Sequence, residues 1–387
     1  MTWEIKQGDA LDALREIPDA TIQCCITSPP YFGLRDYGTG EWEGGEPDCD
    51  HAHAPARTIG NAPSNRSTLT TNNGQGPKPG DKFHADQRRE VATVCTCGAI
   101  RQDQQLGLEP TPDVYVTRLV EVFAEVRRVL RNDGTLWLNV GDSYSAVGGN
   151  NQTPGRTARV GSTQSGAQQR SRRFDSKAKD LLGIPWMLAF ALRADGWYLR
   201  SDVIWAKPNP MPESVTDRPT SAHEHVFLLT KRPSYFYDAD AIREDSSPDM
   251  QRRALLGHTR GPGLRDASRG DATALVGGAA VDGAGRNKRN VWEIATQPYP
   301  EAHFATFPTK LVEPCVLAGS AKNDLVLDPF AGSGTVGVVC CWHGREFVGI
   351  ELNPCYCDMA RQRIEVEGRS GRRAYHPEPA PDQLTLL

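Results

Sequence analysis

Ile26-Thr27-Ser28-Pro29-Pro30-Tyr31 indicates the end of a buried strand followed by a rigid turn. The strand is predicted from the apolar run between Ile22 and Ile26, and the two prolines end it because proline cannot continue a hydrogen-bonded ladder. The turn carries the next side chain, Tyr31, out at the carboxyl edge of a sheet. Open α/β sheets bind their ligands at that edge, so we expect chemistry there.

A second strand and turn stand near the other end of the chain. The apolar run Leu325-Val326-Leu327 predicts a strand, and a glycine-rich segment from Asp328 to Thr335 follows it. A predicted helix and a further strand, Phe347 to Ile350, then lead to Glu351. Glycines let a ligand approach the backbone amides at a helix start, and an acid after the next strand can bind ribose hydroxyls. The spacing G-x-G-x-x-G, which alone would equally indicate a nicotinamide enzyme, is formed by Gly332, Gly334 and Gly337.

Together the two segments resemble the amino-methyltransferases of DNA, which use S-adenosylmethionine. Thr-Ser-Pro-Pro-Tyr looks like the catalytic motif of that family, and Asp-Pro-Phe-Ala-Gly-Ser-Gly looks like its cofactor loop. The catalytic motif comes first, as in the circularly permuted β-group. Gly8-Asp9-Ala10-Leu11 resembles the segment that contacts the cofactor adenine, and Phe307-Pro308-Thr309-Lys310 resembles the motif before the cofactor loop.

The resemblance implies an α/β fold of the Rossmann-like, S-adenosylmethionine-dependent methyltransferase type, circularly permuted. It covers most of the chain outside residues 38–107, 143–180 and 241–290. The catalytic residues that it implies are Ser28, Pro29, Pro30 and Tyr31. The cofactor-binding residues that it implies are Asp9, Ala10, Lys310, Asp328, Phe330, Ala331, Gly332, Ser333, Gly334, Thr335, Glu351 and Asn353. Asp9 is equally suited to cap the helix predicted from Ala10 to Glu16.

The chemistry of such a turn suits methyl transfer to the exocyclic amine of a base flipped out of the duplex. The amine nitrogen is a poor nucleophile, and acceptors such as the Ser28 hydroxyl and the Pro29 carbonyl draw it toward tetrahedral geometry. Tyr31 would stack on the base. Catalysis is then positioning and electrostatics without a covalent intermediate.

The residue just before the two prolines, here Ser28, indicates which base is methylated. In the family, Thr-Ser-Pro-Pro-Tyr is typical of cytosine-N4 enzymes, and Asp- or Asn-Pro-Pro-Tyr is typical of adenine-N6 enzymes. We therefore expect cytosine N4, with adenine N6 as the alternative. Cytosine-C5 chemistry needs a cysteine after proline in the catalytic turn, and neither Pro314-Cys315 nor Pro354-Cys355 stands there.

The composition limits the kinds of partner that the protein can bind. The formal net charge of the 387 residues is −4, so binding of double-stranded DNA must depend on local basic clusters. Residues 143–180 and 241–290 are irregular and rich in Lys and Arg, and they are our candidates for a DNA-contacting loop and a target-recognition insertion. The absence of long apolar runs predicts no membrane partner, and we expect a cytoplasmic protein, bacterial or phage-encoded.

Residues 38–107 form an insertion of a different kind, rich in Gly, Pro, Asn and Thr. Cys49-x-His51 and Cys95-x-Cys97 flank its loop, and four such ligands suit a tetrahedral structural zinc that would clamp the base of the insertion. His53 is a rival ligand, and free thiols are the alternative. A catalytic zinc is not expected, because methyl transfer needs no activated water.

The remaining core is predicted from apolar periodicity. A helix is expected from Asp113 to Arg131 with Gly134 as its stop, then a strand from Leu136 to Val140. Asp142, just beyond, would either position substrate or cap a turn. Further elements are expected at 184–192, 197–205, 223–229 and 311–319, and the loop 205–210 resembles the border of the target-base pocket.

These predictions divide the chain into a catalytic core of residues 1–37, 108–142, 181–240 and 291–366, and a flexible tail, 367–387. Three other functions remain open: an oxidoreductase that uses NAD, a methyltransferase acting on RNA or protein, and a non-catalytic DNA-binding module. A cognate restriction endonuclease is a candidate partner, and the expected assembly is a monomer or homodimer.

Overall fold

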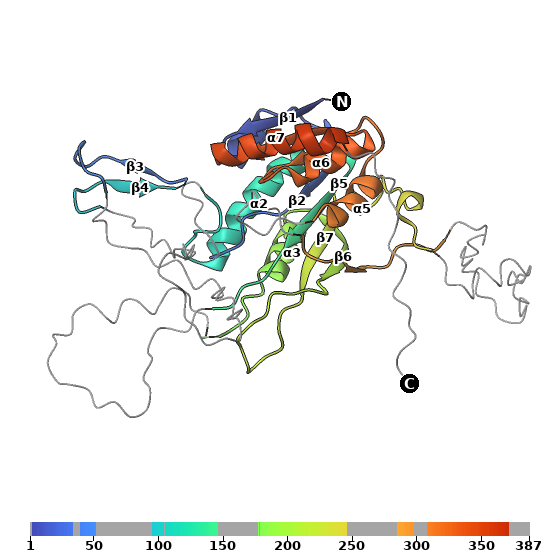
Figure 1. Ribbon diagram of the computed structural model, residues 1–387, viewed down its shortest axis with the longest axis horizontal. Helices are drawn as coiled ribbons and strands as arrows, with labels where there is room; N and C mark the ends of the chain where they lie inside the picture. Colours follow the sequence, from blue (N-terminus) through green and yellow to red (C-terminus); the bar gives the residue numbers. More distant parts are fainter. Residues whose placement is uncertain are drawn as a thin grey trace, which may run out of the picture.

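The computed structural model describes residues 2–33, 39–51, 95–103, 105–145, 177, 179–245, 285–297 and 308–370. Within these residues the architecture is an eight-stranded sheet with helices on both faces (Figure 1). The strands, in spatial order, are β1 (Trp3–Gln7), β10 (Glu346–Glu351), β9 (Leu325–Asp328), β2 (Ile22–Thr27), β5 (Leu130–Val140), β7 (His223–Thr230), β6 (Tyr198–Ala206) and β8 (Val291–Glu293).

The sheet is parallel from β1 to β5, and β7 runs antiparallel to both of its neighbours. The carboxyl ends of β1, β10, β9, β2 and β5 therefore meet at one edge. Val140, at the end of β5, pairs with His225, so the first residues of β7 lie at this same edge. The first strand of the chain pairs with the last one, with Gln7 opposite Glu351.

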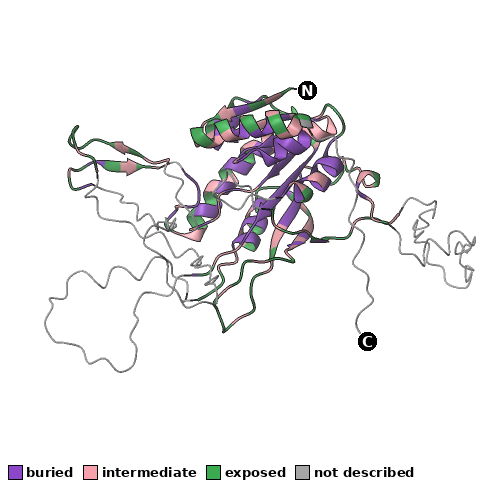
Figure 2. Ribbon diagram, viewed as in Figure 1, coloured by how far each residue is buried: buried purple, intermediate pink, exposed green. Residues whose placement is uncertain are grey.

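The helices cover the two faces in separate groups. One hydrophobic core lies under α1 (Ala10–Arg15), α2 (Pro112–Val129) and α3 (Ile184–Ala194), and the other lies under α5 (Thr309–Gly319), α6 (Thr335–His343) and α7 (Pro354–Ser370). All six residues of β2 are buried, as expected for a central parallel strand covered on both faces (Figure 2). A short 3-10 helix, Asp240–Ile242, packs beside α5.

Two predicted boundaries need correction. The helix α2 ends at Val129, and β5 begins at once with Leu130, so Gly134 lies inside a strand and is no helix stop. A Cβ on Gly134 would lie 3.0 Å from the carbonyl oxygen of Gln23, so its role is the close approach of β5 to β2. At the other end, α7 continues to Ser370, four residues past the predicted limit of the core, and 371–387 lie outside the described residues.

The insertion contributes its own small sheet. In it, β3 (Glu41–Glu43) pairs antiparallel with β4 (Ile100–Gln102), and this hairpin lies apart from the main sheet (Figure 1). Most of the two basic segments, 143–180 and 241–290, falls outside the described residues, so their predicted DNA contacts stay predictions. Among the helices that the structure describes, none has both the length and the apolar character needed to span a bilayer.

Candidate active site

The topology brings the two sequence motifs together at the carboxyl edge. The turn from Ser28 to Tyr31, here called the catalytic turn, follows β2, and the segment from Asp328 to Thr335, here called the cofactor loop, follows β9. These strands are neighbours, and the Thr27 hydroxyl donates a 2.7 Å hydrogen bond to Oδ1 of Asp328 across a separation of 301 residues. The expectation that Tyr31 stands at the carboxyl edge is confirmed.

Asp328 carries an unusual carboxyl group. The residue is fully buried, and its Oδ1 also accepts from the backbone amide of Phe330 at 3.1 Å. Its Oδ2 is buried without a hydrogen-bond partner among the described residues. Burial raises the pKa of Asp328 to about 7, because the charged form loses its solvation. An unpartnered, buried carboxylate oxygen next to a glycine turn is suited to a cationic ligand.

Glu351 faces the cofactor loop from the end of β10. Its Oε2 accepts from the Gly332 amide at 2.9 Å, and its Oε1 accepts from the Asn353 amide at 2.8 Å. Burial raises the pKa of Glu351 as well. Gly332 has a φ of +50°, and a Cβ there would meet only the Phe330 carbonyl oxygen at 4.0 Å, so the backbone faces open space. The carboxylate retains lone pairs for hydroxyl donors.

The other predicted cofactor residues fall into two groups. Ser333 and Thr335 are buried, and their hydroxyls accept from Arg363 of α7 at 2.9 and 3.1 Å, so their side chains hold the loop to that helix. Gly334 also packs on α7, where a Cβ would lie 3.0 Å from that of Ala360. Phe330 and Ala331 belong to the cofactor loop itself. The other predicted residues follow strands or begin helices: Asp9, Ala10, Lys310 and Asn353.

Asp9 acts as a helix cap in this structure. Its Oδ1 accepts from the backbone amides of Leu11 and Asp12 at 2.9 and 3.2 Å, at the start of α1. Asp142 has a similar role for a distant helix: its carboxylate accepts from the amides of Gly183 and Ile184, each at 3.0 Å, at the start of α3. Of its two predicted roles, capping is therefore the one observed.

The catalytic turn is held by residues from other parts of the chain. The hydroxyl of Tyr115, on α2, donates to the Pro30 carbonyl at 2.8 Å, and the Gly33 amide donates to the Gly107 carbonyl at 2.8 Å. Gly107 has a φ of +92°, and a Cβ on it would lie 2.8 Å from the Tyr31 carbonyl oxygen. The end of the insertion thus packs directly against the turn.

The hydroxyl of Tyr31 belongs to a polar network. It donates to Oε2 of Glu224 on β7 at 2.7 Å and lies 3.2 Å from Oδ1 of Asn139 on β5. The Ser28 hydroxyl donates to the Tyr31 oxygen at 3.5 Å, and Lys207 forms an ion pair with Oε1 of Glu224. Burial, followed by the negative charge of Glu224, raises the pKa of Tyr31 well above its usual range, so the phenol stays protonated.

Several partners of the catalytic turn and the cofactor loop were missed in the sequence, Tyr115 and Asn139 among them. Glu224, Lys207 and Arg363 were not predicted as site residues, although Lys207 lies in the loop predicted to border the base pocket. Two signals were available in the sequence. Glu224 is an acid between two histidines at the start of a strand, and Arg363 is an arginine on the apolar side of a helix. Neither signal identifies a partner, because the partners lie far away in the sequence.

The four predicted metal ligands come together at the end of the β3–β4 ladder where Glu43 pairs with Ile100. The ligand atoms of Cys49, His51, Cys95 and Cys97 all lie within 4.8 Å of one another. The Cys49 and Cys95 sulfurs are 3.6 Å apart, and the Cys97 sulfur is 3.7 Å from Nδ1 of His51. Backbone N–H donors from Ala99 and Glu46 lower the pKa of Cys97 to about 6, whereas the neighbouring thiols of Cys97 and Cys95 help to raise the pKa of Cys49 to about 11. Of these two thiols, only Cys97 is favoured as a thiolate. The rival ligand His53 lies outside the described residues.

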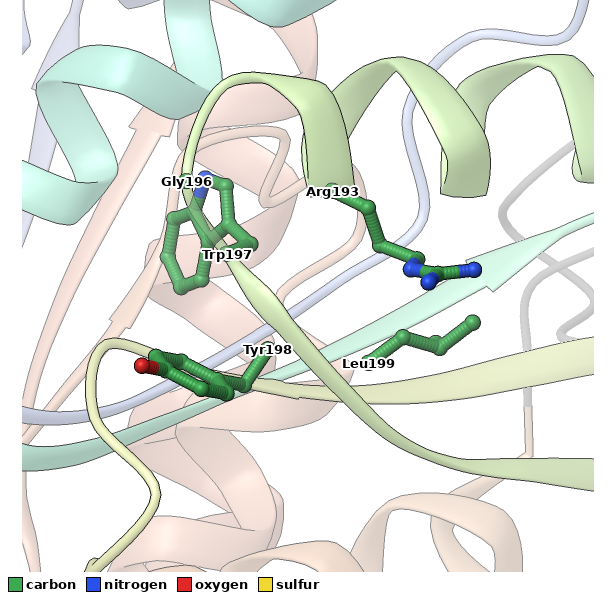
Figure 3. A pocket seen from close by; sticks show the side chains of 5 residues that line it. All are labelled: Arg193, Gly196, Trp197, Tyr198 and Leu199. Carbon is green, nitrogen blue, oxygen red and sulfur yellow. The ribbon is translucent and has the colours of Figure 1, made fainter.

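A surface hollow of about 610 Å³ lies elsewhere, where α3 ends and β6 begins (Figure 3). Its lining consists of Arg193, Gly196, Trp197, Tyr198 and Leu199. Tyr198 pairs with Thr230 at the end of β7, so the hollow lies at the opposite edge of the sheet from the catalytic turn. No predicted site residue lines it.

Comparison with known proteins places these features in context. A DNA methylase family model of the N6/N4 type matches residues 22–362. The Type II methyltransferase M.Cfr9I of Citrobacter freundii is 39% identical over 365 residues, which cover 93% of this chain and 87% of that protein. The Type II methyltransferase M.SmaI of Serratia marcescens is 38% identical over 362 residues, covering 92% and 89%.

One solved structure shares the fold at low sequence identity. The PvuII DNA methyltransferase, described as cytosine-N4-specific, aligns with a TM-score of 0.52 and 14% identity over 95% of this chain and 92% of that chain. The predicted α/β methyltransferase fold is thereby confirmed, whereas an identity this low carries no information on the substrate.

Proposed function

Because this chain belongs to the DNA methylase family of N6/N4 type, we propose that it methylates N4 of cytosine at a specific site in double-stranded DNA. The family makes the protein an S-adenosylmethionine-dependent DNA methyltransferase. The choice of cytosine N4 as the methylated position is the more specific part of the proposal. The observation that carries the function is the contact of Thr27 with Asp328, which joins the catalytic turn to the cofactor loop.

We assign the cofactor to the loop after β9. When bound, S-adenosylmethionine supplies an electrophilic methyl group on a sulfonium. The unpartnered Oδ2 of Asp328 would accept from its amino group, and Glu351 would accept from its ribose hydroxyls. Gly332 would let the ligand approach the backbone. Asp9 and Ala10 follow β1, which pairs with β10 on the side away from β9, and they would face the adenine.

The catalytic turn would hold the target base. The Ser28 hydroxyl and the Pro29 carbonyl would accept from the exocyclic amine, and the face of Tyr31 would stack on the ring. A Cβ on Gly141 would lie only 2.7 Å from Cε2 of Tyr31, so the ring is backed by strand β5 and has little freedom to retreat. The turn therefore contributes mainly orientation.

The choice of cytosine N4 is supported by Ser28, since Thr-Ser-Pro-Pro-Tyr resembles the motif of cytosine-N4 enzymes. Nucleoside mass spectrometry of duplex DNA incubated with the protein and labelled S-adenosylmethionine would test it. N4-methyl-2′-deoxycytidine is the expected product. N6-methyl-2′-deoxyadenosine would overturn the base assignment and keep the enzyme class. Label only in RNA or protein substrates would contradict the function itself.

We also propose a structural zinc ion bound by Cys49, His51, Cys95 and Cys97. The support is the clustering of one thiol–thiol pair, Cys49 with Cys95, and one thiol–imidazole pair, Cys97 with His51, with all four ligand atoms within 4.8 Å of one another. The purified protein should contain one zinc per chain by elemental analysis. Cys97→Ser should lose it, whereas Cys355→Ser, at an exposed thiol on α7, should retain it. Equal zinc content in both variants would contradict the assignment.

Two further proposals concern the arrangement and partners of the chain. The catalytic turn precedes the cofactor loop, and β1 pairs with β10, which supports a circularly permuted order of the β-group type. The Type II relatives support a role as the modification half of a restriction pair. DNA methylated by this protein should then resist an endonuclease encoded beside its gene, and cleavage of such DNA would count against a pair.

A further inference from the structure

The carboxylate of Glu224 stands in an unexpected place, beside the hydroxyl of the base-stacking residue. It comes from the start of β7, and its side chain is 16% exposed. Tyr31 donates to its Oε2 at 2.7 Å, although neither stacking nor the acceptor groups of the turn require a carboxylate there. Burying a charge costs free energy unless it is paired, so its partners are informative.

The partners of Glu224 fix its position and its direction. Lys207 donates to Oε1, and Nδ2 of Asn139 donates to Oε2 at 3.1 Å. Asn139 is held in turn, because the same Nδ2 donates to the His225 carbonyl at 3.2 Å. Lys207 lies over the ring of Trp205, 4.5 Å from its centre. The carboxylate is therefore anchored from strands β5, β6 and β7 at once.

This arrangement determines which way the hydroxyl hydrogens point. A carboxylate can only accept, so the single O–H of Tyr31 is directed to Glu224, and its oxygen offers lone pairs to Ser28 at 3.5 Å. The Ser28 hydrogen is then directed to Tyr31, and the lone pairs of Ser28 remain for another donor. Without the carboxylate, the Tyr31 hydrogen has two remaining acceptors, Oδ1 of Asn139 at 3.2 Å and the Ser28 oxygen at 3.5 Å, and donation to Ser28 would occupy those lone pairs.

We propose that Glu224 is a positioning residue that acts through the Tyr31 hydroxyl to present the Ser28 oxygen as an acceptor for the exocyclic amine. The inference rests on the proposed methyl transfer to an amine. It gives Tyr31 two separable roles, since the ring stacks on the base while the hydroxyl orders the hydrogen bonds. Asn139 and Lys207 support Glu224 in this role.

The first test is Glu224→Gln, which keeps the shape of the side chain but removes its charge and introduces N–H donors. The kcat for methyl transfer to duplex DNA should fall roughly 30-fold, because the acceptor is misoriented. The Kd for S-adenosylmethionine should stay unchanged. Glu313→Gln is the matched control: its carboxylate is 14% exposed and pairs with His343 at 2.7 Å, at the far end of α6, and kcat should not change.

A double-variant cycle separates this role from a merely structural one. Tyr31→Phe keeps the stacking ring, removes the hydroxyl and leaves the pair of Lys207 and Glu224 intact, so it should lower kcat to a similar extent. The double variant should be no slower than Tyr31→Phe alone. The inference would be overturned if the kcat losses of the two single variants multiply in the double variant, or if either single variant has the wild-type kcat. A wild-type enzyme that methylates no DNA would instead refute the proposed function, and this inference with it.

Discussion

The two segments that meet at the carboxyl edge are stabilised in different ways. Much of the cofactor loop is held by nearby residues: Phe330 donates to Asp328, Gly334 donates to Ala331, and Glu351 reaches Gly332 from 19 residues away. Thr27 and Arg363 add longer-range contacts to Asp328 and Ser333. The catalytic turn is held by distant residues. Tyr115, Asn139 and Glu224 follow their partners in the turn by 85, 108 and 193 residues.

This difference separates two functions. Changes at Asp328 should weaken cofactor binding, since the loop supplies its own geometry. Changes around the turn should lower kcat and leave cofactor binding intact, because they act on the orientation of Ser28 and Tyr31. Variants in each region therefore test whether the two segments are energetically independent.

The largest effect is expected for Asp328→Asn. The amide keeps an acceptor for Thr27 and Phe330 but removes the charge of the buried carboxylate. The Kd for S-adenosylmethionine should rise roughly 100-fold at pH 8, as is usual when one partner of a buried charged pair is lost. Isothermal titration calorimetry measures it. A rise of less than about threefold would remove Asp328 from the cofactor site.

Gly141→Ala should have the next largest effect. The added Cβ would lie 2.7 Å from Cε2 of Tyr31, so the ring must shift while its hydroxyl remains tied to Glu224. We expect kcat to fall roughly 30-fold, because small misplacements of a reacting group are costly. The Kd for S-adenosylmethionine, measured on the same preparation, should not change; a parallel loss of both would show that the two segments are coupled.

The pH dependence of cofactor binding sharpens the assignment of Asp328. With its pKa raised to about 7, the carboxyl group is mostly neutral at pH 6 and mostly ionised at pH 7.5. The ionised form binds a cationic amino group, so affinity should increase on the order of tenfold over this range as pH rises. Asp328→Asn should abolish the dependence. If the affinity of the wild-type protein for S-adenosylmethionine stays constant or falls as pH rises, the assignment of Asp328 to the cofactor site is contradicted.

Tyr115→Phe should have the smallest effect. It removes the 2.8 Å hydrogen bond to the Pro30 carbonyl from a fully buried ring. The free energy of unfolding should fall by about 1 kcal/mol, and kcat by roughly threefold. Tyr198→Phe, at an exposed ring of the surface hollow, is the control and should leave both values unchanged. Urea unfolding and steady-state kinetics provide the measurements.

The same contrast explains what could be predicted from the sequence. Apolar runs locate β2 and β9, and the order of glycines and acids locates the cofactor loop, because these are local signals. The two short motifs Cys49-x-His51 and Cys95-x-Cys97 predicted a metal-ligand cluster, and the four ligand atoms do come together. Gly134 was misinterpreted as a helix stop because, in the sequence, a glycine that allows two strands to approach closely cannot be distinguished from a glycine that ends a helix.

The distant partners of the catalytic turn and of the cofactor loop could not be predicted in this way. Glu224 meets Tyr31 only because β7 inserts antiparallel between β5 and β6, which places its first residues at the carboxyl edge. Arg363 meets Ser333 only because α7 packs back on the cofactor loop. Both contacts depend on the topology of the complete sheet, and no local pattern encodes that.

A single-turnover experiment tests the central claim most directly. Wild type and Tyr31→Ala would be loaded with methyl-labelled S-adenosylmethionine and mixed with duplex DNA, and label in DNA and on protein would be followed through one turnover. We expect both proteins to bind the same amount of cofactor, while transfer by Tyr31→Ala is slower by roughly 100-fold or more. Transfer at the wild-type rate, or failure of the variant to bind the cofactor, would contradict the central claim.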